Sequence, residues 1–185
     1  MIKLLTLILL MLLPIPTEAS VTTNDKQIQK YVEKTLSYFD RQGFSLTTDI
    51  VVNLVTRREY ANVVGKKIAQ NSDGCTIGTT VYVVRECSRK DFIVAHELTH
   101  QLQRQLFGAS IYKHRWYCEG TADQIAEAIT GRYVTRANWH LKEFTVDFRS
   151  YEQANWYVYK DANGNPDLAY MVTKGKELVG DVKCQ

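Results

Sequence analysis

Hydrophobic residues recur at helical spacing in several segments of the chain. Between Asp25 and Gln42 they return every three or four residues, and Gly43 follows, which predicts a helix over 25–42. Ser88 stands three residues before Asp91, a pattern typical of a capped helix start, and predicts a helix from there to about Phe107. Comparable patterns predict helices over 59–70, 119–130, 133–144 and 168–179.

Two runs rich in β-branched residues predict strands. They cover 49–56 and 79–85, and the turn-forming residues 71–74 lie between them. Strands therefore come first and helices dominate afterwards, which predicts an α+β fold rather than alternating βαβ units. Because the chain has neither an internal repeat nor a linker, we expect one domain over 20–185.

The N-terminal segment has the pattern of a secretory signal peptide. Lys3 precedes an apolar stretch from Leu4 to Leu13, and Thr17-Glu18-Ala19 offers small residues for cleavage before Ser20. A membrane anchor is the alternative, but a spanning helix needs about 20 apolar residues. We therefore expect residues 1–19 to be removed, no stable membrane insertion after cleavage, and a secreted or periplasmic protein.

The composition is that of an ordinary globular chain, with 45% apolar residues, 10 Gly and 3 Pro. The 23 basic and 20 acidic residues leave a net charge of only +3. This charge is too small to indicate a nucleic acid or an anionic membrane as partner.

Four cysteines follow the signal peptide: Cys75, Cys87, Cys118 and Cys184. An even number in an exported chain favours two disulfides, for which the sequence allows three connectivities. We expect Cys75–Cys87, which bracket a predicted hairpin, and Cys118–Cys184. A four-cysteine zinc site is the alternative, and the lack of a C-x₂-C or C-x₄-C pair disfavours it.

The strongest chemical signal is the H-E-x-x-H sequence from His96 to His100. Residues four apart share one face of a helix, so both imidazoles can bind one metal ion. Glu97 lies beside them, where it can take a proton from a metal-bound water. A catalytic zinc needs a third protein ligand. The downstream residues that could supply it are Glu119, Asp123, His114 and His140.

Residues 116–122 (WYCEGTA) resemble the W-x-x-E-G-x-A stretch that follows H-E-x-x-H in gluzincin metallopeptidases. Eighteen residues separate His100 from Glu119, as in the zinc aminopeptidase branch of that group. The resemblance covers residues 96–127 and implies a zincin-like domain with one Zn²⁺ per chain and Glu119 as third ligand. The metzincin pattern is absent, because Gln103 and Leu106 occupy its Gly and His positions.

Asp123 is the expected partner of a ligand histidine. Glu119, Asp123 and Glu127 are spaced by four residues and share one helix face. Metal-bound histidines usually donate their second N–H to a carboxylate, and thermolysin-like gluzincins carry an acid at this place. A solvated helix face is the alternative for Asp123 and Glu127.

The resemblance implies an exported zinc metallopeptidase that hydrolyses protein or peptide substrates with Glu97 as general base. The G-A-M-E-N sequence of the aminopeptidases is absent, so we expect an endopeptidase. In the gluzincin fold the strand before the active-site helix is an edge strand, which assigns substrate pairing to residues 79–85. The sequence does not decide which group stabilises the oxyanion. The candidates are Tyr151, Tyr157 and His140.

Two other functions are compatible with the same residues. One is a non-catalytic, zinc-stabilised binding protein with a zincin fold. An intact Glu97 argues against it, because a site without catalysis has no need of the base. The other is zinc-dependent hydrolysis of a non-peptide bond, which the same water could perform.

Overall fold

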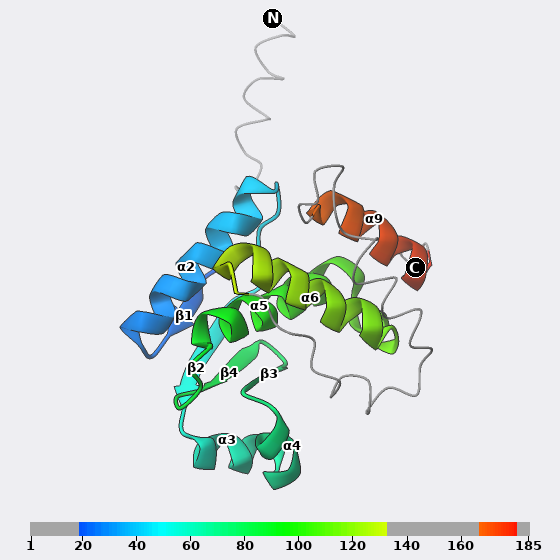
Figure 1. Ribbon diagram of the computed structural model, residues 1–185. Coiled ribbons are helices and arrows are strands. Elements are labelled where there is room, and N and C mark those ends of the chain that lie inside the picture. The colour runs from blue at the N-terminus through cyan, green and yellow to red at the C-terminus, as the bar shows by residue number, and fades with distance from the viewer. Residues whose placement is uncertain (1–18, 133–166, 181–185) are drawn as a thin grey trace, which may run out of the picture.

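The computed structural model describes residues 19–132 and 167–180, in which a small sheet is covered by helices (Figure 1). The sheet has four strands in the order β1-β2-β4-β3. The observed strands are β1 (Val21–Thr23), β2 (Ile50–Val55), β3 (Gly74–Ile77) and β4 (Thr80–Val84). The strands expected over 49–56 and 79–85 are confirmed as β2 and β4.

The sheet is mixed. Strands β1, β2 and β4 are parallel neighbours, whereas β3 pairs antiparallel with β4 in a hairpin that turns at Gly78. The first three elements form a β-α-β unit, which the sequence did not predict because β1 has only three residues. The prediction that 79–85 form an edge strand is wrong, since β4 lies between β2 and β3. The edge on this side is β3.

The observed helices match those predicted from the hydrophobic pattern, but several begin or end at different residues. The expected helix over 59–70 is two helices, because Gly65 between them has a φ of 87°, a conformation that ends α3. The helix expected from Glu119 starts four residues earlier. The observed helices are α2 (Lys26–Arg41), α3 (Arg57–Val64), α4 (Lys66–Asn71), α5 (Lys90–Phe107), the 3₁₀ helix η1 (Ala109–Lys113), α6 (Arg115–Thr130) and α9 (Leu168–Val179).

The start of α5 differs from the expected capping pattern. The residue that precedes its first turn is Arg89, and no side chain caps the helix. Asp91 instead pairs with Arg132 after α6, with 2.8 Å between Oδ2 and Nε. This ion pair ties the start of α5 to the end of α6.

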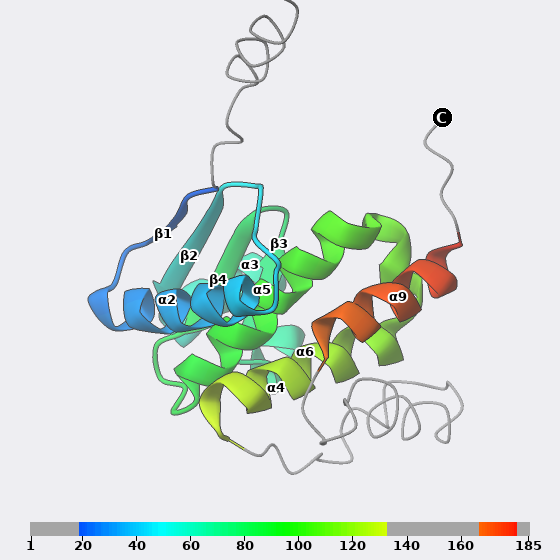
Figure 2. The ribbon, with the colours of Figure 1, turned by 90° about the horizontal axis from the view of Figure 1, so that it is seen from above.

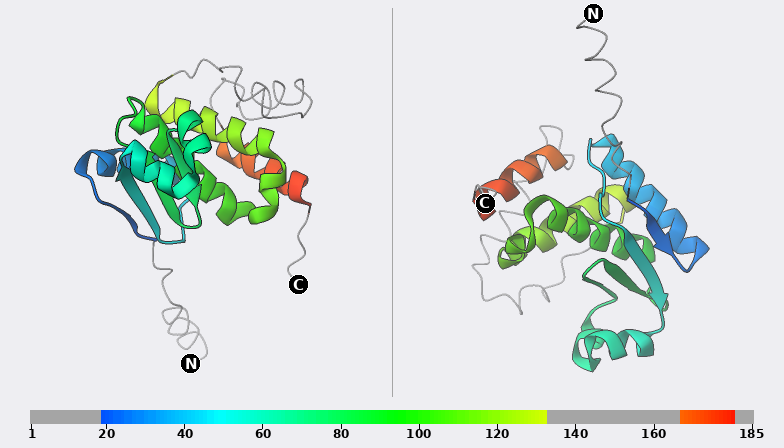
Figure 3. Two further views of the ribbon diagram at one scale, coloured as in Figure 1. Left: turned by 90° about the horizontal axis from the view of Figure 1, so that it is seen from below. Right: turned by 180° about the vertical axis from the view of Figure 1, so that it is seen from behind.

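Helices α2 and α5 cover one face of the sheet, and α3 and α4 lie on its other side (Figures 1 and 3). Alternate residues of the central strands point into this layer; Val52 on β2 and Val81 and Val83 on β4 are fully buried. Leu98 and Leu102 of α5 complete the core. Helix α5 is thus held between the sheet and α6, as the view from above shows (Figure 2).

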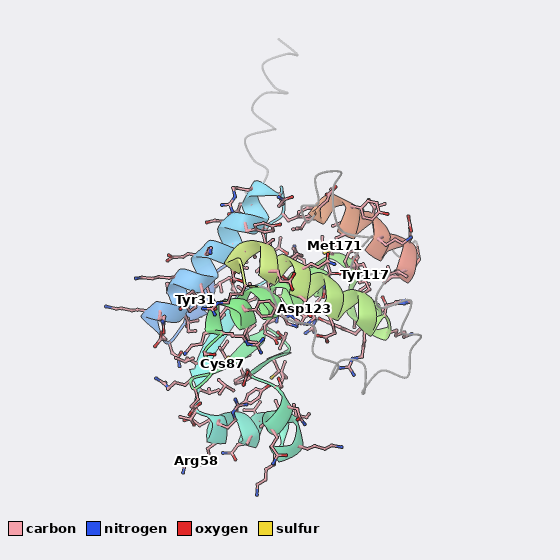
Figure 4. The ribbon with its side chains drawn as sticks, in the orientation of Figure 1. Tyr31, Arg58, Cys87, Tyr117, Asp123 and Met171 are labelled. Carbon is pink, nitrogen blue, oxygen red and sulfur yellow. The ribbon has the colours of Figure 1, made fainter. Side chains whose placement is uncertain are left out.

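Helix α9 packs where α5 and α6 meet. Tyr117 on α6 donates a 2.6 Å hydrogen bond from its hydroxyl to the carbonyl of Met171 on α9 (Figure 4). Gly175 of α9 lies so close to Phe107 and Tyr117 that a Cβ there would overlap their rings. The predicted helix over 168–179 is confirmed, and it supports α5 and α6 from the side away from the sheet.

The expected Cys75–Cys87 disulfide is not formed, and both thiols are free. The strand register explains the difference: Cys75 pairs with Tyr82, and Cys87 follows the end of β4. Strand β4 ends at Val84 and the chain turns before Cys87, so the pairing of the hairpin does not place Cys87 opposite Cys75, as a disulfide requires. Cys118 is also free, and its expected partner Cys184 lies outside the described residues.

Other sequence predictions fall outside the described residues: the signal peptide up to residue 18, the helix over 133–144, and the residues His140, Tyr151 and Tyr157. Within 19–132 and 167–180, no helix has the length and apolar character needed to span a bilayer.

Candidate metal centre

His96 and His100 come together because they lie one turn apart on α5. Their Nε2 atoms are 3.0 Å apart, and the rings meet edge to face with centroids 4.7 Å apart. The two residues are buried, with 9% and 8% of their surface exposed. The rigid helix therefore presents two imidazole nitrogens to one point.

Glu119 reaches the same point from α6. Its Oε2 lies 3.3 Å from Nε2 of His96 and 3.7 Å from Nε2 of His100. Ligand atoms about 2.1 Å from a tetrahedral zinc are about 3.4 Å apart. The separations among the three atoms cluster around that value, so the group could hold a metal ion. Among the described residues, His114, at the start of α6, does not belong to this group.

The three side chains polarise one another. Burial lowers the pKa of His96, but the carboxylates of Asp123 and Glu119 outweigh it and raise the pKa well above its ordinary value. Burial acts in the same way on His100, and Glu119 raises its pKa. Burial raises the pKa of Glu119, but the two imidazoles hold it well below its usual range. The group therefore favours an anionic carboxylate beside positive charge.

Asp123 lies where the sequence expected it, against a ligand histidine. Its Oδ1 is 2.9 Å from Nδ1 of His96, and the residue is buried at the crossing of α5 and α6 (Figure 4). The carboxylate meets the ring nitrogen opposite the one that faces Glu119. The nearby carboxylate favours a proton on Nδ1, which would leave Nε2 to bind a metal.

Glu97 is held by the edge strand β3. The hydroxyl of Thr76 donates a 2.8 Å hydrogen bond to Oε2 of Glu97. Gly74 lies two residues earlier on the same face of β3, and a Cβ at this position would lie 3.5 Å from the other oxygen, Oε1. One carboxylate oxygen is thus fixed while the other lies beside a residue without a side chain.

Three residues near the centre were not predicted to act there. They are Thr76, Gln103 and Tyr112. The hydroxyl of Tyr112 donates to the backbone carbonyl of His100 at 3.2 Å, and burial raises the pKa of this tyrosine to about 12. Thr76 and Tyr112 belong to other elements than α5, so only the tertiary structure brings them to the motif.

Compared with protein families, with curated proteins and with solved structures, the chain has no match in any of the three.

Proposed function

We propose that this protein is an exported zinc-dependent metallopeptidase of the gluzincin type that cleaves protein or peptide chains internally. The observation that carries the proposal is the convergence of His96, His100 and Glu119 on one point, with Glu97 next to it. The resemblance of residues 96–127 to gluzincins supports the same function.

Zinc is the metal that the donor set favours. Two imidazoles and one carboxylate are the protein ligands of several catalytic zinc sites, which keep a fourth position for water or substrate. Harder ions such as Mg²⁺ and Ca²⁺ prefer oxygen ligands, of which Glu119 alone supplies one here. When bound, zinc acts as a Lewis acid and lowers the pKa of a water molecule to about 7.

Glu97 is the residue that moves the proton. The hydrogen bond from Thr76 orients the carboxylate, and an oxygen of Glu97 accepts a proton from the attacking water. The same oxygen then returns the proton to the leaving amine. The fixed carboxylate orientation supports this role, because proton transfer requires a donor and acceptor within hydrogen-bond reach.

The edge position of strand β3 supports the proposal that the substrate is a peptide. The inner side of β3 pairs with β4, and among the described strands none pairs with its outer side. An extended peptide can add to such an edge through backbone hydrogen bonds. Because Thr76 of β3 donates a hydrogen bond to Glu97, a peptide paired with this strand would lie near the proposed base. This assignment to β3 replaces the expected one to residues 79–85.

The test is cleavage of a diverse peptide library by the protein that begins at Ser20, with Glu97→Gln as the matched variant. We expect cleavage within peptides by the wild type and loss of at least about 100-fold in the variant, since general base catalysis supplies about 10²–10⁴-fold. Both proteins should retain zinc. Zinc-loaded wild type that cleaves no peptide would favour the binding protein or a non-peptide substrate.

A further inference from the structure

Gln103 joins the two helices that carry the metal group. It is fully buried on α5, one turn after His100. Its Nε2 donates a 3.0 Å hydrogen bond to the carbonyl of Cys118 on α6, and its Oε1 lies 2.8 Å from Nδ1 of His100. Cys118 directly precedes Glu119 in the chain. One amide side chain therefore contacts a histidine of the group and the backbone beside its carboxylate.

The two contacts determine the orientation of the amide. A backbone carbonyl can only accept, so the NH₂ of Gln103 must face Cys118 and its oxygen must face His100. An amide oxygen also only accepts, so Nδ1 of His100 carries the proton. The remaining nitrogen, Nε2, is the one that faces His96 and Glu119, and it binds a metal through its lone pair when the ring carries only the Nδ1 proton.

We propose that Gln103 is a positioning residue that selects the Nδ1-protonated form of His100 and fixes its ring against α6, so that Nε2 binds the metal. The inference rests on the metal centre proposed above. On the other histidine, the carboxylate of Asp123 lies 2.9 Å from Nδ1 of His96. When each ring carries its proton on Nδ1, the lone pairs on the two Nε2 atoms face Oε2 of Glu119. The three atoms lie within 3.7 Å of one another, and a bound cation would stabilise this arrangement.

The chemistry of position 103 is specific for an amide. A carboxylate could accept from His100 but would repel the carbonyl of Cys118, and an apolar side chain would leave Nδ1 of His100 without this acceptor and remove the hydrogen bond to α6. Glutamine satisfies an N–H donor on one side and a C=O acceptor on the other.

The first measurement needs no variant. In the zinc-loaded wild type labelled with ¹⁵N in its histidine rings, NMR reports which nitrogen of His100 carries the proton. We expect a slowly exchanging N–H at Nδ1 and zinc at Nε2. Zinc bound through Nδ1 of His100 would overturn the proposal.

The second measurement compares zinc affinities in competition with a chelator. Gln103→Met should bind zinc about 10–100-fold more weakly, as when other residues that hold metal ligands are lost, and the protected Nδ1–H signal should disappear. Gln101→Met is the control, because Gln101 is a buried glutamine of α5 whose amide donates to the carbonyl of Gly78, 2.9 Å away, and not to a ligand. Its zinc affinity should change less than threefold.

The outcomes separate the two proposals. A wild type that takes up no zinc would overturn the metal centre itself. A wild type that binds zinc, with equal affinity and an unchanged Nδ1–H signal in Gln103→Met, would overturn only the role of Gln103. If Gln103→Met does not fold, the NMR measurement on the wild type decides alone.

Discussion

The hydroxyl of Thr76 donates a hydrogen bond to Oε2 of Glu97 across 2.8 Å, joining the edge strand β3 to the centre of α5. The two residues are 21 positions apart in the chain. The contact fixes one oxygen of the carboxylate that we propose as the general base. It also places that carboxylate against the strand that we propose to pair with substrate.

Replacement of Thr76 tests this contact. Thr76→Val keeps the shape of the side chain and removes the donor, so we expect peptide cleavage to fall by about 10-fold or more, since hydrogen bonds to charged groups contribute about 1.5–3 kcal/mol. The fall should be in kcat, with zinc affinity unchanged. Thr76→Ser, which keeps the hydroxyl, is the control and should retain most of the activity. Equal kcat in Thr76→Val and wild type would remove Thr76 from the mechanism.

Asp123 should strengthen zinc binding through His96. Asp123→Asn removes the charge that lies 2.9 Å from Nδ1 of His96, and we expect zinc affinity to fall by about 10-fold. The affinity is measured by competition with a chelator. Asp91→Asn provides a control, because Asp91 lies on α5 but pairs with Arg132 away from the metal group. Identical zinc affinities in all three proteins would show that Asp123 does not support the ligand.

Gly74 should tolerate no side chain. A Cβ at this position would overlap Cγ2 of Ile93 and lie 3.0 Å from the carbonyl oxygen of Tyr82. We expect Gly74→Ala to lower the free energy of unfolding by about 1–3 kcal/mol, as overpacked cores do, in urea titrations of the wild type and variant. Ile93→Ala should offset part of this loss in the double variant. Additive effects of the two substitutions would contradict the close contact.

The pairing of Ser20 with Asp49 predicts a pH-dependent stability. The backbone nitrogen and the hydroxyl of Ser20 donate to Oδ1 of Asp49 at 2.8 and 2.9 Å, and these bonds lower the pKa of its carboxyl. The proposed cleavage before Ser20 would place an α-ammonium at this nitrogen and strengthen the pairing. A lowered pKa in the folded state stabilises the protein above the unfolded pKa of about 3.9 and ceases to do so as the pH falls through the folded pKa.

We therefore expect Asp49→Asn to be less stable than the wild type near pH 7, with the difference shrinking as the pH falls below the unfolded pKa of about 3.9. Urea titrations of the protein that begins at Ser20, over this pH range, measure it. A difference that does not change with pH would contradict the ion-pair account.

Local patterns were enough to predict much of the fold. The period of apolar residues predicted α2 and α9, and β-branched runs predicted β2 and β4, because each element buries one regular face. The three-residue strand β1 carries no such period, and only its pairing with β2 defines it. Strand order likewise depends on tertiary pairing, so the edge position of β3 could not be read from the chain.

The residues of the candidate site likewise fall into those that the sequence predicted and those that it could not predict. His96, Glu97 and His100 follow from helical spacing within one motif, and the resemblance to gluzincins pointed to Glu119. Thr76 could not be predicted, because a lone threonine on a short strand carries no signal of its contact with α5. Gln103 lies one turn beyond His100, and the sequence offered that spacing as a clue. The wrong Cys75–Cys87 pairing arose because the hairpin register was unknown.

The most direct test of the account is the zinc content of the purified protein that begins at Ser20, compared with Glu119→Ala and Glu97→Gln. The account predicts one zinc per chain in the wild type and in Glu97→Gln, and a large loss of zinc in Glu119→Ala. Absence of zinc from the wild type, or full retention in Glu119→Ala, would contradict the metal centre formed by His96, His100 and Glu119.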